Sequence, residues 1–239
     1  PPSMKRPEDG SNDSSAPNTT LSWKSFVSIR LRRYPRVKST GLDWLGDVPS
    51  HWELAPGFAA FRLRKDRNTG LRETKVLSLS YGQIIVKPTD RLHGLVPESF
   101  ETYQIVSKND IIIRPTDLQN DWNSLRVGLA RERGVITSAY LCLATSERVT
   151  SDYGYLLLYA YDLKKIFYGM GSGLRQNLDF ADLRRMPILL PPKEEQHRIA
   201  AFLDQFDHRV NRLIASKRRL IGLLEEQKQA IIHRAVTRG

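Results

Sequence analysis

Between residues 53 and 150, hydrophobic positions alternate with polar ones or form short runs that end at Gly, Pro or Asp. Short runs of this kind are typical of strands. Leu77–Ser80 alternates leucine with serine, and Ile84–Val86 follows a turn at Tyr81-Gly82-Gln83, which predicts a hairpin closed at that turn. A further short, buried strand is predicted at Ile111–Ile113.

Two more elements follow in the same region. Val127–Ala130 and Val135–Ala144 flank the polar segment Arg131–Gly134, which predicts a second hairpin. From Asp152 to Phe167, apolar residues recur at spacings of three and four, as in an amphipathic helix. The pattern therefore predicts a β-rich α+β domain over residues 34–191.

Residues 192–236 have a helical period instead. Glu194 and Glu195 follow Pro191-Pro192, in the first turn of the predicted helix, where acidic groups favour the helix dipole. Forty-odd helical residues would extend roughly 60 Å at about 1.5 Å each. Lys217 and Gln227 are polar members of a regularly spaced seam. Its apolar members are Ile199, Leu203, Phe206, Val210, Leu213, Leu220, Leu224 and Ile231.

This narrow seam requires a partner helix, because each large apolar side chain left in water forfeits about 1.5–3 kcal/mol. The sequence predicts no second helix of comparable length. The partner is therefore expected to be another chain, either a second copy or a different protein. The alternative is that the helix bends back onto its own domain.

The composition adds an excess of basic residues, with a formal net charge of +11. Such a charge favours a polyanionic partner, either nucleic acid or an acidic membrane surface. The excess is +5 in residues 1–40, +2 in residues 41–192 and +4 in residues 193–239. The middle of the chain is therefore nearly neutral, apart from a basic strip that is either a solvated surface or a phosphate contact: Arg62, Arg64, Lys65 and Arg67.

Several classes of protein do not fit the sequence. No apolar stretch approaches the ~18 residues that a membrane span needs. Residues 1–20 are rich in Pro, Ser, Asn, Asp and Thr, and residues 1–33 are predicted to form a disordered or poorly ordered arm, with an over-long start as the alternative. Cys142 lies between two leucines and, as the only cysteine, cannot form an internal disulfide. We expect a buried structural thiol rather than a nucleophile, in a cytosolic protein.

The sequence also contains none of the catalytic motifs considered next. The sequence has no Gly-x-x-x-x-Gly-Lys-Ser/Thr loop, and Gly169, Gly171 and Gly173 follow no buried strand of a nucleotide fold. The five histidines are scattered without the spacing of metal ligands, and no Asn/Asp-Pro-Pro-aromatic segment of a DNA methyltransferase is present. We therefore predict neither a catalytic nor a metal site.

Four ordered segments carry a family resemblance: Trp44–Trp52 (WLGDVPSHW), Gly134–Tyr140 (GVITSAY), Gly169–Arg175 and Pro187–Asp204 (PILLPPKEEQHRIAAFLD). In order and spacing, the chain resembles the specificity subunit of type I restriction-modification systems over about residues 34–236. The Pro-Pro-x-Glu-Glu-Gln segment and the long helix after it are the most specific part.

The sequence departs from the family pattern at two positions and in copy number. Lys193 replaces a usually apolar residue, and Thr137 replaces a frequent serine. Full-size members carry two target recognition domains and two long helices that pack antiparallel, whereas this chain has one of each. The resemblance therefore implies a half-length subunit whose helix pairs with that of a second copy, giving a homodimer.

The resemblance implies a non-catalytic DNA-binding protein of the prokaryotic cytoplasm. Such a dimer would direct modification (methyltransferase) and restriction (endonuclease) subunits to a bipartite, palindromic site on double-stranded DNA, with the gap set by helix length. S-adenosylmethionine, ATP and Mg would be used by those partner subunits, and no cofactor would be bound directly. The alternative from another class is a coiled-coil scaffold or orphan fragment that binds proteins without reading DNA.

Candidate DNA contacts follow from side-chain chemistry. The basic strip is expected to contact phosphates. Arg, Asn and Gln make bidentate contacts with guanine or adenine edges, which favours polar loop residues as base readers. The expected readers are Tyr81, Gln83, Arg114, Gln119, Asn120, Asn123, Arg126, Arg175 and Gln176. Trp44, Pro49 and Trp52 are expected to be packing anchors instead.

Overall fold

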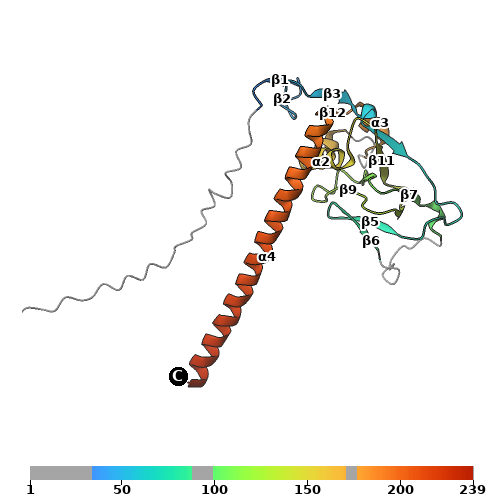
Figure 1. Cartoon of the computed structure of the whole chain (residues 1–239). Helices are drawn as coiled ribbons and strands as arrows, with labels where there is room; N and C mark the ends of the chain where they lie inside the picture. Colours follow the sequence, from blue (N-terminus) through green and yellow to red (C-terminus); the bar gives the residue numbers. More distant parts are fainter. Residues whose placement is uncertain (1–33, 88–98, 171–176, 239) are drawn as a thin grey trace, which may run out of the picture.

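A computed structural model describes residues 34–87, 99–170 and 177–238 of the 239-residue chain. They form a β-rich domain from which a long helix, α4 (Lys193–Arg238), projects (Figure 1). The predicted α+β class, a β-rich domain followed by a long helix, is confirmed. The arm predicted at residues 1–33 lies outside the described residues.

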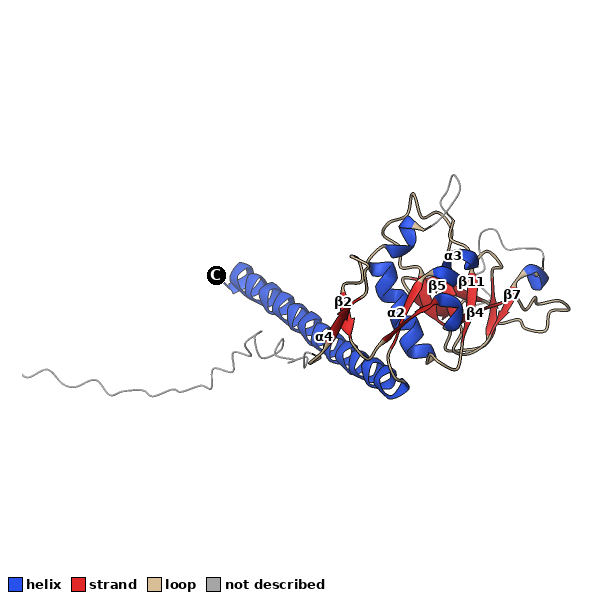
Figure 2. Cartoon of the chain, turned by 90° about the horizontal axis from the view of Figure 1, so that it is seen from above, coloured by secondary structure: helices blue, strands red, loops and turns tan. Residues whose placement is uncertain are grey.

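The centre of the domain is an antiparallel sheet of four strands in the order β4 (Phe61–Arg64), β11 (Leu141–Thr145), β8 (Ile111–Ile113) and β9 (Val127–Leu129). Helix α2 (Ser151–Leu163) lies against this sheet and contacts its last three strands (Figure 2). The predicted strand at Ile111–Ile113 is confirmed, and it is one of the two inner strands.

The all-apolar sequence of β8 reflects burial on both faces. Ile111 and Ile113 belong to the core cluster between the sheet and α2, together with Leu158 of the helix. Ile112 points to the other face, into a second cluster that includes Cys142. Successive side chains of a strand alternate between faces, so a strand covered on both sides needs apolar residues at every position.

The second face is covered by two pairs of strands. The predicted hairpin is confirmed: β5 (Leu77–Ser80) pairs with β6 (Gln83–Val86). Tyr81 and Gly82 both have positive φ, 48° and 75°, as a two-residue type I′ turn requires. The hairpin packs closely over β9, since a Cβ on Gly128 would lie 2.7 Å from a methyl carbon of Leu79.

The second predicted hairpin is wrong. β9 pairs with β8, whereas β10 (Gly134–Ile136) pairs with β7 (Gln104–Val106) in a separate sheet. A turn closed by a hydrogen bond from the Tyr140 amide to the Thr137 carbonyl separates β10 from β11. The run of alternating residues is therefore two strands whose partners lie far away in the sequence.

The remaining elements connect the N-terminal segment to the base of α4. β3 (Glu53–Pro56) pairs with β12 (Pro187–Leu190), the strand that leads directly into α4.

The predicted helix from Asp152 to Phe167 is observed as α2 followed by a 3-10 turn. The other elements are β1 (Val37–Ser39), β2 (Asp47–Pro49), η1 (Gly57–Ala59), η3 (Phe100–Thr102), η4 (Ile166–Gly169) and α3 (Phe180–Arg185).

The predicted packing anchors and the structural cysteine agree with the structure. Trp44 and Trp52 pack against the main core cluster, and Pro49 is buried. Cys142 is buried, with its thiol 3.5 Å from a carboxylate oxygen of Asp110. Burial and the adjacent carboxylate raise the pKa of this thiol, so it remains protonated and unreactive.

Helix α4 runs away from the domain (Figure 1). Its first turns contact α2, and Ile199 packs against the main core cluster. Beyond Val210, every described residue except Gly222 is exposed. Along the described part of the chain, no helix combines the length and apolarity needed to cross a membrane.

Candidate nucleic-acid interface

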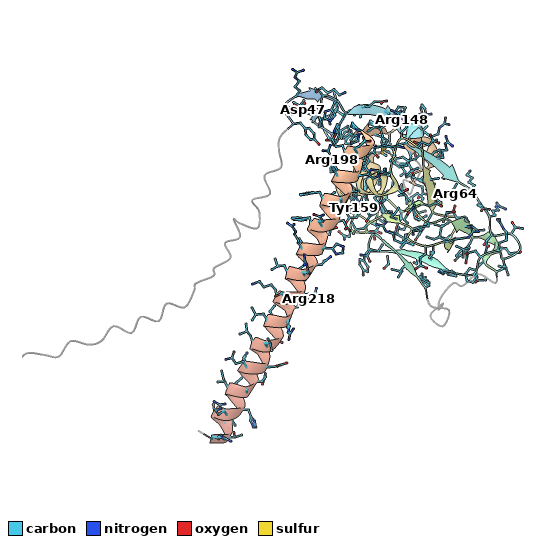
Figure 3. All side chains as sticks on the ribbon, in the orientation of Figure 1. Asp47, Arg64, Arg148, Tyr159, Arg198 and Arg218 are labelled. Atoms are coloured by element: carbon cyan, nitrogen blue, oxygen red, sulfur yellow. The ribbon has the colours of Figure 1, made fainter. Side chains whose placement is uncertain are left out.

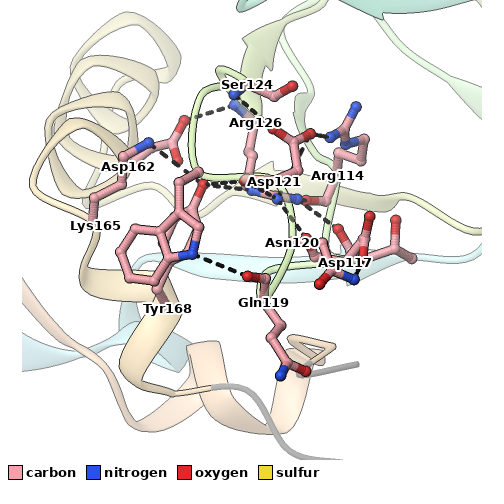
Figure 4. A network of polar contacts seen from close by, with 12 residues as sticks. Arg114, Asp117, Gln119, Asn120, Asp121, Ser124, Arg126, Asp162, Lys165 and Tyr168 are labelled. Carbon is pink, nitrogen blue, oxygen red and sulfur yellow. Dashed lines mark hydrogen bonds and ion pairs between the residues drawn. The ribbon is translucent and has the colours of Figure 1, made fainter. Parts of the chain in front are cut away.

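A polar loop of residues 114–126, here called the polar loop, joins β8 to β9 and is built around Arg126. Although charged, Arg126 is fully buried. Its two terminal nitrogens donate hydrogen bonds of 2.6–3.3 Å to four backbone carbonyl oxygens of the same loop (Figure 4), those of Arg114, Thr116, Asp117 and Asp121. One side chain therefore connects four points of the loop between Arg114 and Asp121.

Residues behind the polar loop complete this network. The Nε of Arg126 donates to the hydroxyl of Tyr168 at 2.9 Å, and that hydroxyl donates to the Asp121 carbonyl, also at 2.9 Å. The backbone amide of Arg126 donates to Asp162 at 2.6 Å. Burial raises the pKa of Asp162 despite this hydrogen bond and the nearby cations. The loop is thus held against α2 and η4.

On the outer side of the network, Asp121 ties the loop to itself. Its carboxylate accepts the Ser124 amide at 2.9 Å and forms an ion pair with Arg114. Hydrogen bonds from Ser124, together with the Arg114 guanidinium, outweigh the effect of burial and lower the pKa of Asp121 to about 2. Asp121 is therefore ionised at neutral pH, and Arg114 is paired with it.

The fixed loop presents an exposed set of side chains. Gln119, Asn120 and Asn123 are exposed, and Trp122 between them is 53% exposed. The Trp122 indole N–H donates to the Gln119 carbonyl at 3.0 Å, and its ring lies 4.5 Å from the ring of Tyr168. Three amide side chains and one indole face therefore point outward from a rigid support.

Two other segments lie beside the polar loop. Asn177 accepts the Asp117 amide, and the Leu178 amide donates to the Pro115 carbonyl, so the segment after the glycine-rich stretch contacts the loop. An open pocket of about 580 Å³, lined partly by Asn120, lies between them. The predicted readers Arg175 and Gln176 lie outside the described residues.

The second segment beside the polar loop is the tip of the β5–β6 hairpin. A Cβ on Gly82 would lie 3.1 Å from Leu125 of the polar loop and 3.3 Å from Tyr159 of α2. Tyr81 is 91% exposed, and Gln83 is exposed as well. The structure therefore brings the tip with Tyr81 and Gln83 next to the loop that carries the exposed amides.

The basic strip is not part of this arrangement. Arg62 and Arg64 lie on β4, an edge strand at the opposite side of the central sheet from β9. Arg64 lies on the side of the domain away from α4 (Figure 3) and donates to the buried Asp110 at 3.1 Å. Arg62, Lys65 and Arg67 are exposed. Their proposed phosphate contacts stay predictions, at a different edge from the polar loop.

One predicted reader needs correction. The sequence predicts that Arg126 contacts a base, but it is fully buried and its guanidinium donors are engaged by carbonyls and Tyr168. The sequence alone did not predict this burial, because an arginine in a polar segment gives the same sequence pattern whether its side chain faces solvent or the interior. Base contacts by the other residues in the loop and hairpin stay predictions.

The joint between the domain and α4 was not predicted as a site. Glu195, in the first turn, is buried and accepts hydrogen bonds from His51 Nε2 at 2.9 Å and Trp52 Nε1 at 3.2 Å, as well as from Tyr34. Burial alone would raise the pKa of Glu195, but these hydrogen bonds outweigh it and lower the pKa. The carboxylate is therefore ionised and holds three N-terminal side chains.

Gln196 secures the other side of the same turn. Its amide oxygen accepts the Thr150 amide, and its nitrogen donates to the carbonyls of Arg148 and Pro191, all at 2.9 Å. The Glu-Glu-Gln segment at the start of α4 thus fixes the direction in which the helix leaves the domain. The signal for this role was the density of polar residues at a helix start that follows two prolines.

The apolar seam of α4 becomes more exposed along the helix. Ile199 and Leu203 are partly buried, Phe206 is 38% exposed, and Ile231 is 60% exposed. The groove between α2 and α4 is lined by other helix positions, His197, Ala200, Ala201, Asp204 and Asp207. Only the start of the seam therefore lies against the domain, and the alternative of a helix folded back onto its own domain is not observed.

Among the described residues, no group of three or more His, Cys, Asp or Glu side chains is arranged to hold a metal ion.

Comparison with known proteins decides the family. Residues 73–221, more than half of the chain, match the model of the type I restriction modification DNA specificity domain. The chain belongs to this family. The matched region of this specificity domain runs from just before the hairpin, through the polar loop, into the second half of α4.

Individual relatives agree with the family model. The specificity domain is 26% identical over 139 residues to the type I restriction enzyme MjaVIII specificity subunit of Methanocaldococcus jannaschii, covering 56% of this chain and 31% of the relative. Its fold is similar to that of the HsdS subunit from Thermoanaerobacter tengcongensis, with a TM-score of 0.51, 19% identity, and coverage of 83% of this chain and 47% of the other.

A second solved structure shows the same fold. It comes from work on complex assembly and conformational transition of the type I R-M system, with a TM-score of 0.56 and 18% identity. The match covers 83% of this chain and 48% of that chain. The specificity domain thus spans about a third of the curated relative's length and about half of each solved chain.

Proposed function

We propose that this chain is the sequence-specific DNA-binding subunit of a type I restriction-modification system, in a half-length form with one recognition domain. The observation that carries the proposal is the polar loop: buried Arg126 fixes its backbone, and Gln119, Asn120 and Asn123 are exposed on it. Amide side chains on a rigid support can make bidentate contacts with adenine. A loop without such support would have to be ordered on binding, and that cost in free energy would reduce its selectivity between sequences.

The long helix supports a homodimer. Its exposed apolar seam needs a partner helix, which a second copy of this chain can supply. Residues 193–208 carry four acidic and two basic residues, whereas residues 209–238 carry two acidic and eight basic residues. Antiparallel pairing of two copies places these opposite charges side by side, which favours a two-fold dimer with the domains at opposite ends.

In this proposal the chain performs no chemistry. It directs modification and restriction subunits to a bipartite, palindromic site, and those subunits use S-adenosylmethionine, ATP and Mg. The length of α4 sets the distance between the two half-sites.

Gel-shift titration of the full chain at two salt concentrations tests the proposal, using a duplex that carries the motif found by methylome sequencing of the host. We expect selective binding that weakens steeply with salt, because phosphate contacts release counterions. Asn123→Ala should reduce selectivity and leave the salt slope unchanged. Lys65→Gln should reduce the slope of log binding constant against log salt concentration by about one, and should weaken binding to all sequences alike.

The competing function is a coiled-coil scaffold that binds proteins only. It predicts equal affinity for the motif and for a scrambled duplex, even with modification subunits present. That result would reject the proposal. A methylome motif that is bipartite and palindromic supports both the specificity function and the two-fold symmetry.

A further inference from the structure

We propose that Trp122 reads the 5-methyl group of a thymine, so that the half-site recognised by the polar loop contains an A·T pair. This inference rests on the proposed DNA-binding function and assigns a specificity-determining role to a residue outside the predicted set of contacts. It follows from how Trp122 is held and from which of its atoms are left exposed.

The indole of Trp122 is fixed on two sides. Its only polar group, the N–H, donates to the Gln119 carbonyl of its own loop at 3.0 Å. Its ring lies 4.5 Å from the Tyr168 ring at an interplanar angle of 30°. Tyr168 is itself buried and contacts the Arg126 guanidinium, 5.2 Å from the ring centroid. The exposed half of Trp122 is therefore a preorganised, purely apolar surface.

The Trp122 indole, held by one hydrogen bond and one ring contact, leaves apolar area in water, so covering that area with a partner would be favourable. In the major groove of intact duplex DNA, the apolar group available to a protein is the thymine methyl. Packing against it would bury apolar area without an unsatisfied polar atom, because the indole N–H is already bonded within the loop.

The neighbouring side chains fit the same base pair. Asn120 lies two positions before Trp122 and Asn123 directly after it, and both are exposed; the Asn120 amide nitrogen also donates to a carboxylate oxygen of Asp117 at 2.8 Å. An amide side chain pairs with the N6 and N7 edge of adenine, and the thymine paired with that adenine shows its methyl in the same groove. The amides and the indole are thus suited to the two halves of one A·T pair or of adjacent pairs.

Deoxyuridine substitution tests this inference, because it removes only the methyl group. The probe is the duplex carrying the methylome motif, with one thymine at a time replaced by deoxyuridine, titrated with the full chain. For one thymine in the half-site we expect about a four-fold loss of affinity, the value of one buried methyl group. Trp122→Ala should bind the thymine and deoxyuridine duplexes equally.

Two controls separate this effect from misfolding. Phe58→Ala removes an aromatic side chain that is 57% exposed but lies on η1, outside the polar loop, and should keep the full methyl effect. Trp122→Gln retains a long side chain without an apolar face, and should lose the methyl effect as Trp122→Ala does. Circular dichroism verifies that each variant is folded.

The outcomes distinguish this inference from the proposed function. Selective binding with no deoxyuridine-sensitive thymine, a methyl effect that persists in both Trp122 variants, or a half-site without an A·T pair would each overturn the inference and leave the proposed function intact. Equal binding of motif and scrambled duplexes would overturn both. A four-fold methyl effect that disappears only in the Trp122 variants supports it.

Discussion

At the scale of single residues, the polar loop depends on the buried guanidinium of Arg126. The Arg126 guanidinium donates to four loop carbonyls and a tyrosine hydroxyl; of these, the carbonyls of Asp117 and Asp121 also accept from the Asp121 amide and the Tyr168 hydroxyl. The planar fork of arginine suits several acceptors at once, whereas lysine offers a single point charge. Arg126 is therefore a positioning residue for the exposed amides.

We expect Arg126→Lys to lower the free energy of unfolding by about 3–5 kcal/mol, because breaking a buried charged network leaves polar groups unpaired. Urea denaturation measures the change. Arg72→Lys is the matched control: Arg72 pairs with Asp66 on the surface, and its replacement should change stability by less than about 0.5 kcal/mol. Equal effects of the two substitutions would contradict a bracing role for Arg126.

Asp121 gives a second prediction, about pH. Its pKa is lowered to about 2 in the folded protein, from an ordinary 3.8, so its ionised form stabilises the fold above pH 3.8. That contribution is lost as the pH falls from about 3.8 to about 2. We expect Asp121→Asn to be less stable than the wild type at pH 7, and the difference to shrink over this acidic range.

Urea unfolding of both proteins between pH 7 and the lowest pH at which each still folds measures this difference. Asp182→Asn, in the capping box of α3 and away from the polar loop, controls for general effects of removing a carboxylate. A gap between wild type and Asp121→Asn that stays constant with pH would show that the carboxylate charge is not what stabilises the loop.

At the scale of elements, the joint between the domain and α4 determines where the helix points. Glu195 faces inward and collects hydrogen bonds from His51, Trp52 and Tyr34, while Glu194 beside it is exposed. Both acidic groups are in the first turn and interact favourably with the helix dipole. Only Glu195 also connects the helix to the N-terminal segment.

The two adjacent glutamates therefore form a matched pair for mutation. We expect Glu195→Ala to destabilise the protein by about 1–3 kcal/mol, because three donors lose a charged acceptor. It should also raise amide hydrogen exchange in the first turns of α4, measured by mass spectrometry, with exchange in β8 unchanged. Glu194→Ala should lose only about 0.3–1 kcal/mol of dipole interaction. Identical exchange in the two variants would count against a special role for Glu195.

At the scale of the whole molecule, the exposed seam of α4 is the feature that requires an assembly. Along the seam, Leu213 is 39% exposed and Leu220 is 47% exposed in the single chain. Burying such residues against a second helix recovers about 1.5–3 kcal/mol each. A charged group placed in the same seam would have to be buried without a partner.

We accordingly expect Leu213→Asp and Leu220→Asp to abolish dimerisation, or docking of the modification subunit, while the recognition domain stays folded. Sedimentation mass and complex assembly are the measurements, with near-UV circular dichroism as the test of folding. Ala215→Asp introduces the same charge on the opposite side of the helix and should leave assembly unchanged. Unaltered mass in the two leucine variants would exclude this seam as the interface.

The sequence by itself determined the local and periodic features: the hairpin at Tyr81-Gly82, the buried strand Ile111–Ile113, and the long helix with its unpartnered seam. Each depends on turn chemistry or on a repeat within a short stretch, which tertiary packing seldom overrides. The family was identified from the sequence for the same reason: its motifs are short, local segments that can be recognised without knowing the fold.

Only the tertiary structure decided which strands pair and which way each polar side chain faces. Arg131–Gly134 has the composition of a hairpin turn, yet β9 and β10 belong to different sheets, because alternation specifies a face and not a partner. Arg126 turns inward and Trp122 outward within the same loop. Those orientations depend on carbonyls and rings contributed by distant segments, such as Tyr168, whose positions exist only once the chain has folded.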